Sequence, residues 1–193
     1  VRHVYTFVSA AHCIGSDTVQ KERVAQFKAI PFYITFDKTD IKTFYQTTVT
    51  GVGYQHRGDD FAQFEVMSLL DWPTVPIGDE RKEKEGSGVL NIASPLGLGL
   101  QVFHGHISKL ELDRPIVQGD INWKGSVLLQ MSGSDGGSSG SAIISEKQQA
   151  IVAFLVGTIN GTTITAIPAS RFTAFQARLD AGTYRWMTHM EDE

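Results

Sequence analysis

A glycine-rich turn over residues 136–144 presents a serine and runs directly into an apolar strand. Glycines ahead of Ser139 can take positive φ values, which turn backbone N–H groups towards the oxygen that becomes negative when a hydroxyl attacks a carbonyl. Ser139 is therefore the candidate nucleophile, and the N–H groups of Gly137 and Ser139, with Ser138 as a further donor, are the candidate oxyanion hole. Taken alone, the pattern is more often an ordinary hairpin loop.

Two other stretches change that reading. The sequence Val-Ser-Ala-Ala-His-Cys places His12 after a short apolar run, and Asp60 lies at the start of an alternating strand. A hydroxyl is a poor nucleophile until an imidazole accepts its proton, and the imidazole needs a carboxylate to fix its tautomer. The chain order His12, Asp60, Ser139 therefore predicts a catalytic triad. Asp59 remains an alternative to Asp60 because the alternation does not separate them, whereas the Ser-Gly dipeptide favours Ser139 over Ser138.

The motif Ser-Ala-Ala-His-Cys around His12 resembles the histidine motif of the trypsin-like serine proteases. The second half of the chain is similar to the HtrA/Deg-type branch, and the resemblance extends from His12 to about Phe175. The matching segments are residues 93–99, 105–108, 128–130, 137–140 and 165–168. The resemblance implies a serine endopeptidase with an all-β fold, in which two antiparallel six-stranded-type β-barrels precede a C-terminal helix. It also favours Asp60 over Asp59, and a secreted or periplasmic location.

This sequence departs from the family pattern at two positions beside the nucleophile. Ser141 stands where the family usually has a glycine, and Ser138 stands where the animal digestive members have an aspartate. Activation through an ion pair with a newly cut N-terminus is therefore not expected. In the family the residue after the histidine often pairs with an upstream cysteine; Cys13 is the single cysteine of this chain, so an internal disulfide framework is excluded.

The resemblance also places the first specificity pocket. Its walls would come from residues just before the nucleophile and from the strand that follows. These residues are Gly133, Ser134, Asp135, Ala153, Phe154, Leu155, Val156 and Gly157. Gly133, at the expected base, carries no carboxylate, so we expect cleavage after small or medium apolar residues, with Asp135 leaving a preference for Lys or Arg as the alternative.

Composition narrows the classes of partner. The chain has 193 residues, 41% of them hydrophobic and 20% charged, and a net charge of −4, which does not favour nucleic acid or an anionic membrane as a partner. No apolar segment approaches the length of a membrane span, and no cofactor is expected. His104 and His106 share one face of an expected strand, but no third ligand stands at metal-site spacing, so we expect no metal. A polypeptide substrate is the expected partner.

The elements that must position the triad are short strands and one helix. We expect strands at about 3–9, 25–36, 42–52, 61–66, 88–93, 100–112, 126–131, 142–145, 150–158 and 162–167. A helix capped by Ser170 should continue to about Ala181. The proline-punctuated, charged segment 73–86 is expected to link a first barrel, 1–72, with His12 and Asp60, to a second, 87–193, with Ser139 and the helix.

The first barrel has fewer strand candidates than the six strands of a complete barrel. Only one short strand precedes His12, and four or five strand candidates lie before the linker. Because an unpaired sheet edge leaves N–H and C=O groups unsatisfied, we expect the natural chain to continue upstream of Val1, or else a reduced barrel covered by a loop or a partner chain. A catalytically inactive trypsin-fold binding or scaffold module is the alternative function, and the intact triad favours the enzyme.

Overall fold

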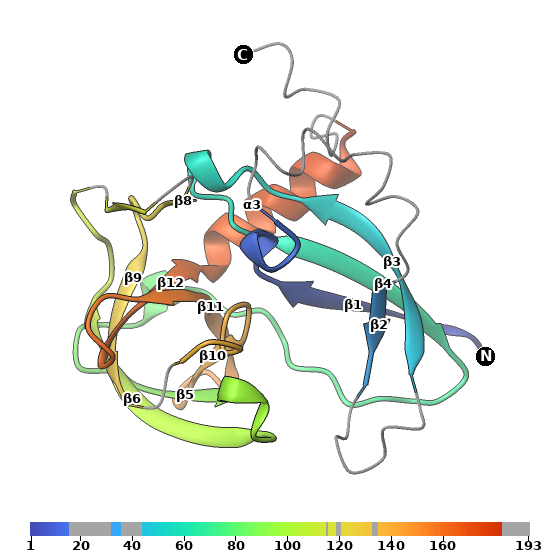
Figure 1. The fold of residues 1–193 in the computed structure, drawn as a ribbon, viewed down its shortest axis with the longest axis horizontal. Coiled ribbons are helices and arrows are strands. Elements are labelled where there is room, and N and C mark those ends of the chain that lie inside the picture. Colours follow the sequence, from blue (N-terminus) through green and yellow to red (C-terminus); the bar gives the residue numbers. More distant parts are fainter. Residues whose placement is uncertain (16–31, 36–43, 115, 119–120, 133–134, 183–193) are drawn as a thin grey trace.

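The computed structural model describes residues 1–15, 32–35, 44–114, 116–118, 121–132 and 135–182. Figure 1 shows a β-barrel on one side, a β-sheet on the other, and one long helix reaching from the barrel to the sheet. The helix is α3 (Ala169–Asp180), and it follows the last barrel strand without a loop. The prediction of an all-β, chymotrypsin-like fold with a C-terminal helix is confirmed.

The second half of the chain forms a closed antiparallel barrel. Its strands pair in the order β10-β11-β12-β9-β6-β5, so that every strand has two neighbours. They are β5 (Gly88–Ala93), β6 (Gln101–Lys109), β9 (Val127–Met131), β10 (Ala142–Ser145), β11 (Ala150–Thr158) and β12 (Thr163–Pro168). A small hairpin, β7 (Val117–Gln118) and β8 (Ile121–Asn122), lies between β6 and β9. Closure satisfies the backbone groups that an open sheet would leave unpaired at its edges.

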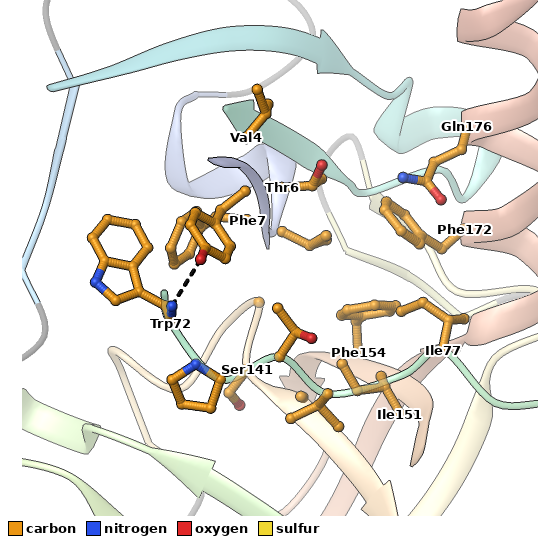
Figure 2. A pocket seen from close by; sticks show the side chains of 17 residues that line it. Val4, Thr6, Phe7, Trp72, Ile77, Ser141, Ile151, Phe154, Phe172 and Gln176 are labelled. Atoms are coloured by element: carbon orange, nitrogen blue, oxygen red, sulfur yellow. Dashed lines mark hydrogen bonds between the residues drawn. The ribbon is translucent and has the colours of Figure 1, made fainter. Parts of the chain in front are cut away.

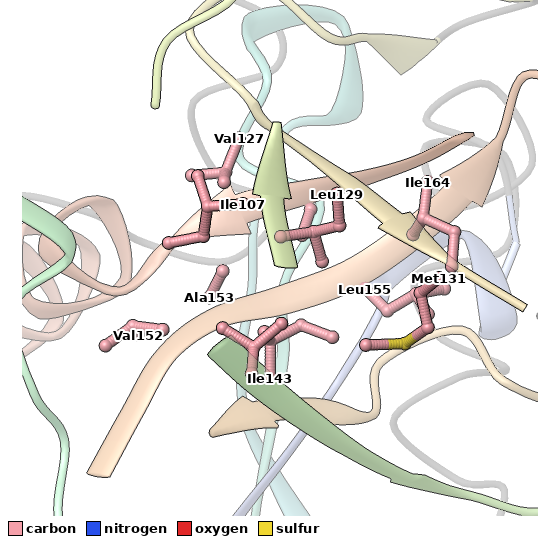
Figure 3. Packing of buried hydrophobic residues seen from close by; sticks show 11 residues of the cluster. Ile107, Val127, Leu129, Met131, Ile143, Val152, Ala153, Leu155 and Ile164 are labelled. Atoms are coloured by element: carbon pink, nitrogen blue, oxygen red, sulfur yellow. The ribbon is translucent and has the colours of Figure 1, made fainter. Parts of the chain in front are cut away.

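The barrel is filled by aliphatic side chains that alternate along its strands. Ile107, Leu129, Ile143 and Ile164 are almost fully buried and converge on the barrel axis (Figure 3). Alternation places every second residue inside, which is why the period-2 pattern of the sequence predicts these strands well. The barrel is therefore a packed scaffold on which the 135–141 loop is mounted.

The first half forms a four-stranded antiparallel sheet in the described residues, in the order β1-β4-β3-β2. The strands are β1 (His3–Ser9), β2 (Phe32–Ile34), β3 (Tyr45–Val52) and β4 (Ala62–Ser68). In the β1–β4 ladder, Ser9 pairs with Ala62. Because the strands are antiparallel, the chain leaving β1 and the chain entering β4 meet at one end of the sheet. His12 and Asp60 lie in these two segments.

A buried aromatic cluster joins the sheet, the barrel and the helix. Phe61 precedes β4 and is fully buried, with its ring 5.8 Å from Phe154 of β11 and 5.2 Å from Phe172 of α3. Phe154 and Phe172 lie 5.1 Å apart, and Phe175 also contacts Phe61. The rings thus fix the first half of the chain against the second.

An apolar cavity of about 520 Å³ lies beside β1 (Figure 2). All residues from Val4 to Val8 line it, which is the pattern of a strand edge rather than of one face. Trp72 also lines the cavity, and its backbone N–H donates to the Tyr5 hydroxyl at 2.7 Å. Residues of β11 and α3 complete the lining. Among the described strands, β1 pairs only with β4. The expectation that further chain completes this half stays a prediction, as does the division at 73–86.

The helix begins differently from the sequence prediction. Pro168 is the N-cap residue and makes no side-chain cap, so the prediction that Ser170 caps the helix is wrong. Glu80, in the 3-10 turn Glu80–Lys82, caps it instead: its Oε2 accepts the Ser170 N–H at 3.0 Å and its Oε1 accepts the Ser170 hydroxyl. A carboxylate is favourable there because the first N–H groups of a helix lack intrahelical partners. No helix in the described ranges is long and apolar enough to cross a bilayer.

Glu80→Ala should therefore destabilise the fold by about 1–3 kcal/mol, because the partly buried Ser170 N–H and hydroxyl lose their acceptor. Urea unfolding measures the change. Glu85→Ala, at an exposed position five residues on, is the control and should stay within about 0.5 kcal/mol of wild type. Equal stability of the two variants would contradict the capping role.

Candidate active site

His12 and Asp60 form a two-point contact. Asp60 Oδ2 lies 2.6 Å from His12 Nδ1, and Asp60 Oδ1 accepts the His12 backbone N–H at 2.8 Å. The carboxylate is 1% exposed, whereas the imidazole is partly exposed. Because Nδ1 is engaged with the carboxylate, Nε2 is the ring nitrogen that remains for proton transfer. The structure thus brings together two of the three predicted triad residues.

The environment of His12 favours its charged form. Burial lowers the pKa of the imidazole, but the hydrogen bond to Asp60 and the charge of that carboxylate, with a further contribution from Cys13, outweigh it and raise the pKa to about 10. The exposed thiol of Cys13 is thus part of the surroundings of His12. The effect of Cys13 on His12 was not predicted, although the two residues are adjacent in the chain.

Asp59, the alternative acid, faces elsewhere. Its carboxylate accepts a hydrogen bond from Arg178 Nη2 at 2.8 Å and lies 3.3 Å from Arg171 Nε, both on α3. Two adjacent aspartates therefore have separate partners: Asp59 binds the C-terminal helix, and Asp60 binds His12. The geometry separates the two residues where the sequence alternation did not.

The Ser139 loop is seated against the chain just before His12. A Cβ at Gly140 would lie 2.5 Å from the Ala10 backbone nitrogen and 2.6 Å from Ser9 Cα, a contact that only glycine permits. Gly140 N–H also donates to Leu155 O of β11 at 2.7 Å, which ties the loop to the barrel. Ser139 is therefore presented from the barrel towards the segment that carries His12, although in this structure its hydroxyl makes no hydrogen bond with the described His12 side chain.

The backbone of the loop leaves two N–H groups available. Ser138 N–H donates to Asp135 O at 3.0 Å, whereas the N–H groups of Gly137 and Ser139 have no hydrogen-bond partner within the described part of the chain. Gly137 has φ +96°, which an L-residue rarely adopts. The Ser138 side chain is fully buried, unlike that of Ser139.

Ser141, the departure from the family pattern, has a structural partner. Asn91 of β5 is buried, and its Nδ2 donates to Ser141 Oγ at 2.8 Å and to Ala142 O at 2.9 Å. The role of Asn91 was not predicted; its signal in the sequence is an amide side chain within the apolar strand Gly-Val-Leu-Asn-Ile-Ala. The hydroxyl at position 141 thus helps to anchor the strand that follows Ser139.

The residues predicted for the specificity pocket lie in several environments. Gly133 and Ser134 are outside the described residues, and Asp135 is exposed, with its carboxylate accepting Gly136 N–H at 2.7 Å. On β11, Ala153 and Leu155 belong to the barrel core, Phe154 and Val156 to the aromatic cluster, and Gly157 packs against Trp123. Their role in binding substrate stays a prediction.

The histidine pair on β6 lies away from these groups. His104 is exposed, with Nδ1 3.5 Å from Glu146 Oε1. The parts of the chain that the structure describes hold no cluster of three or more His, Cys, Asp or Glu side chains. The described side chains therefore offer no metal centre.

The His12–Asp60 pair should make stability depend on pH. Since the folded pKa of His12, about 10, exceeds its ordinary value of 6.5, the pair contributes fully below pH 6.5 and its contribution is lost as pH rises towards 10. Asp60→Asn should cost about 1.5–3 kcal/mol near pH 6 and much less above pH 10. Urea unfolding of both proteins across this range measures the difference; a constant difference would contradict the pairing.

The fold matches solved protease structures at low sequence identity. One is the HtrA-type protease AlgW with a decapeptide, with a TM-score of 0.68, 15% identity, and coverage of 91% of this chain and 48% of that one. Another is a variant of AlgW with a tripeptide, with a TM-score of 0.67, 16% identity, and coverage of 92% of this chain and 53% of that one. The inactive form of a serine-to-alanine mutant of Rv3671c from M. tuberculosis also matches, with a TM-score of 0.57 and 16% identity. That match covers 73% of this chain and 68% of the other. This chain spans about half the length of the AlgW structures.

No curated protein sequence matches the chain. The family of the trypsin-like peptidase domain, in contrast, matches residues 1–153, which include the segments of His12, Asp60 and Ser139 and most of the barrel. The match covers well over half of the sequence, and the fold is that of HtrA-type proteases. The chain therefore belongs to the trypsin-like peptidase family.

Proposed function

We propose that the protein is a serine endopeptidase that uses His12, Asp60 and Ser139 as a catalytic triad. The observation that carries the proposal is the buried Asp60 carboxylate, which engages both Nδ1 and the backbone N–H of His12. A histidine oriented in this way needs only a hydroxyl on its Nε2 side to act as a general base. Ser139 supplies it, since Gly140 seats its loop on Ser9 and Ala10.

The reaction would proceed by acyl transfer. Ser139 Oγ attacks the scissile carbonyl carbon while His12 Nε2 takes the hydroxyl proton, and His12 then gives that proton to the leaving amine as the C–N bond breaks. Water, deprotonated by His12, then attacks the acyl-enzyme. The ester C–O bond breaks as His12 returns the proton to Ser139 Oγ, which releases the acid. Asp60 stabilises the imidazolium at both charged stages. The general base is the neutral imidazole, whose fraction rises as the pH approaches the His12 pKa of about 10.

The negative oxygen of each tetrahedral intermediate would be bound by the N–H groups of Gly137 and Ser139. Both are available, because neither makes a hydrogen bond with described residues. Donors that are fixed before the reaction stabilise the oxyanion without reorganisation, and the loss of one costs about 10²–10³-fold in kcat. Ser138 is the weaker candidate donor, since its N–H is engaged with Asp135.

The substrate would be an extended polypeptide. The AlgW structures carry a decapeptide and a tripeptide, which supports a polypeptide ligand for this chain as well. A β11 strand of apolar residues and no carboxylate at position 133 favour small or medium apolar side chains before the scissile bond.

Ser139→Ala and His12→Ala should each lower casein hydrolysis by about 10⁴-fold or more, because either change removes the nucleophile or its base. Both variants should also lose covalent labelling by a fluorophosphonate probe. Ser138→Ala is the matched control and should keep substantial activity, although the buried hydroxyl contributes to stability.

Full hydrolysis by Ser139→Ala at wild-type stability would contradict the nucleophile assignment. A wild-type protein that binds peptides but neither labels nor hydrolyses would support the alternative function, a catalytically inactive trypsin-fold binding module.

Profiling with a peptide library should show cleavage after Val, Ala or Leu. Discrimination among these residues should be modest, because a methylene in an apolar pocket contributes only about 1–3 kcal/mol. A dominant Arg or Lys signal that disappears in Asp135→Asn would transfer the specificity role to Asp135 and overturn this preference.

A further inference from the structure

Leu96 has a backbone conformation that leucine rarely adopts. It has φ +53° and ψ +15°, inside the short turn Pro95–Gly97 between β5 and β6. Only Leu96 and Gln149, also at φ +53°, are non-glycine residues with positive φ in the described ranges. The left-handed region is disfavoured for an L-residue with a bulky side chain, so other contacts must hold Leu96 there.

The contact that holds it belongs to the nucleophile loop. Leu96 N–H donates to Gly136 O at 2.7 Å, across a separation of 40 residues in the chain. The same turn touches the next residue too, since Ser94 O lies 2.9 Å from the position of a Cβ on Gly137. The turn is closed by its own bonds, Gly97 N–H to Ser94 O at 3.2 Å and Leu98 N–H to Pro95 O at 3.1 Å.

This contact fixes the direction of a catalytic donor. The peptide bond between Gly136 and Gly137 is planar and trans, so its C=O and N–H point in opposite directions. When Leu96 holds the Gly136 oxygen on one side, the Gly137 N–H must point to the other side. Glycines on both sides of the bond would otherwise let this peptide rotate at little steric cost.

We propose that Leu96 is a positioning residue for the oxyanion hole: its N–H, presented from a left-handed conformation, orients the 136–137 peptide so that Gly137 N–H faces the reacting carbonyl. The inference rests on the proposed function, because it assigns Gly137 as an oxyanion donor. The Leu96 side chain is 65% exposed, so what matters is its backbone conformation and not its packing.

Substitutions that change only the preference for the left-handed region test the proposal. Leu96→Gly and Leu96→Asn accept that region, whereas β-branched Leu96→Val disfavours it strongly. Leu96→Val should lower kcat towards a peptide ester by about tenfold or more with KM within about threefold, because the donor acts only on the transition state. Leu96→Gly and Leu96→Asn should keep kcat within about twofold of wild type.

The matched control is the exposed Gln149, which has the same φ but lies in the β10–β11 turn. The same three substitutions there should shift Tm in the same order and leave kcat unchanged. A further readout is the affinity for a peptide aldehyde, which forms an oxyanion with Ser139. Leu96→Val should weaken aldehyde binding and leave binding of the corresponding alcohol unchanged.

The outcomes distinguish a failure of the Leu96 role from a failure of the proposed function. The role of Leu96 alone would be overturned if the wild type is active and Leu96→Val keeps its kcat and aldehyde affinity. In that case Leu96→Val would only lower Tm, as Gln149→Val does. A wild type that neither hydrolyses nor labels would overturn the proposed function and this inference with it.

Discussion

The packing of Phe61 is the interaction on which the site depends. Phe61 belongs to the first half of the chain, yet its ring is buried between β11 and α3 of the second half. Burying such a side chain contributes about 1.5–3 kcal/mol, and each aromatic contact adds about 0.5–1.5 kcal/mol. Asp60 is its immediate neighbour, so the same packing that joins the two halves also places the carboxylate at the junction. The β1–β4 ladder places the segment of His12 at the same junction. The close contact of Gly140 with Ser9 and Ala10 places Ser139 there.

The two adjacent carboxylates show how the surroundings assign roles. A buried charge is costly unless it is paired or hydrogen-bonded. Asp59 meets that requirement through Arg178 and Arg171 of α3, and Asp60 meets it through the imidazole and backbone of His12. The C-terminal helix therefore holds the carboxylate of Asp59 away from His12. Removal of the arginines would leave Asp59 as an unpaired charge beside Asp60.

The sequence predicted the local elements better than the contacts between them. The strands His3–Ser9, Ala142–Ser145 and Ala150–Thr158 begin and end where expected, because alternation and turn residues are local signals. The cap of α3 was wrong because its acceptor, Glu80, lies 90 residues from Ser170. Asn91 was missed for the same reason, since its partner Ser141 is 50 residues away. Chain order and the family resemblance predict His12, Asp60 and Ser139 as a triad, and the resemblance favours Asp60 over Asp59. The physical reason for that choice, the separate partners of the two aspartates, depends on tertiary contacts.

The 135–141 loop is held by backbone hydrogen bonds to two other segments and by one bond within itself. Gly136 O accepts from Leu96, Ser138 N–H donates to Asp135 O within the loop, and Gly140 N–H donates to Leu155 O of β11. Ser138 replaces the aspartate that would receive a new N-terminus, and its buried side chain lies inside the turn. Because two of these bonds come from a neighbouring turn and strand, the geometry of Gly137 depends on how those elements pack. Leu96, in its left-handed conformation, is the residue through which the β5–β6 turn affects that geometry.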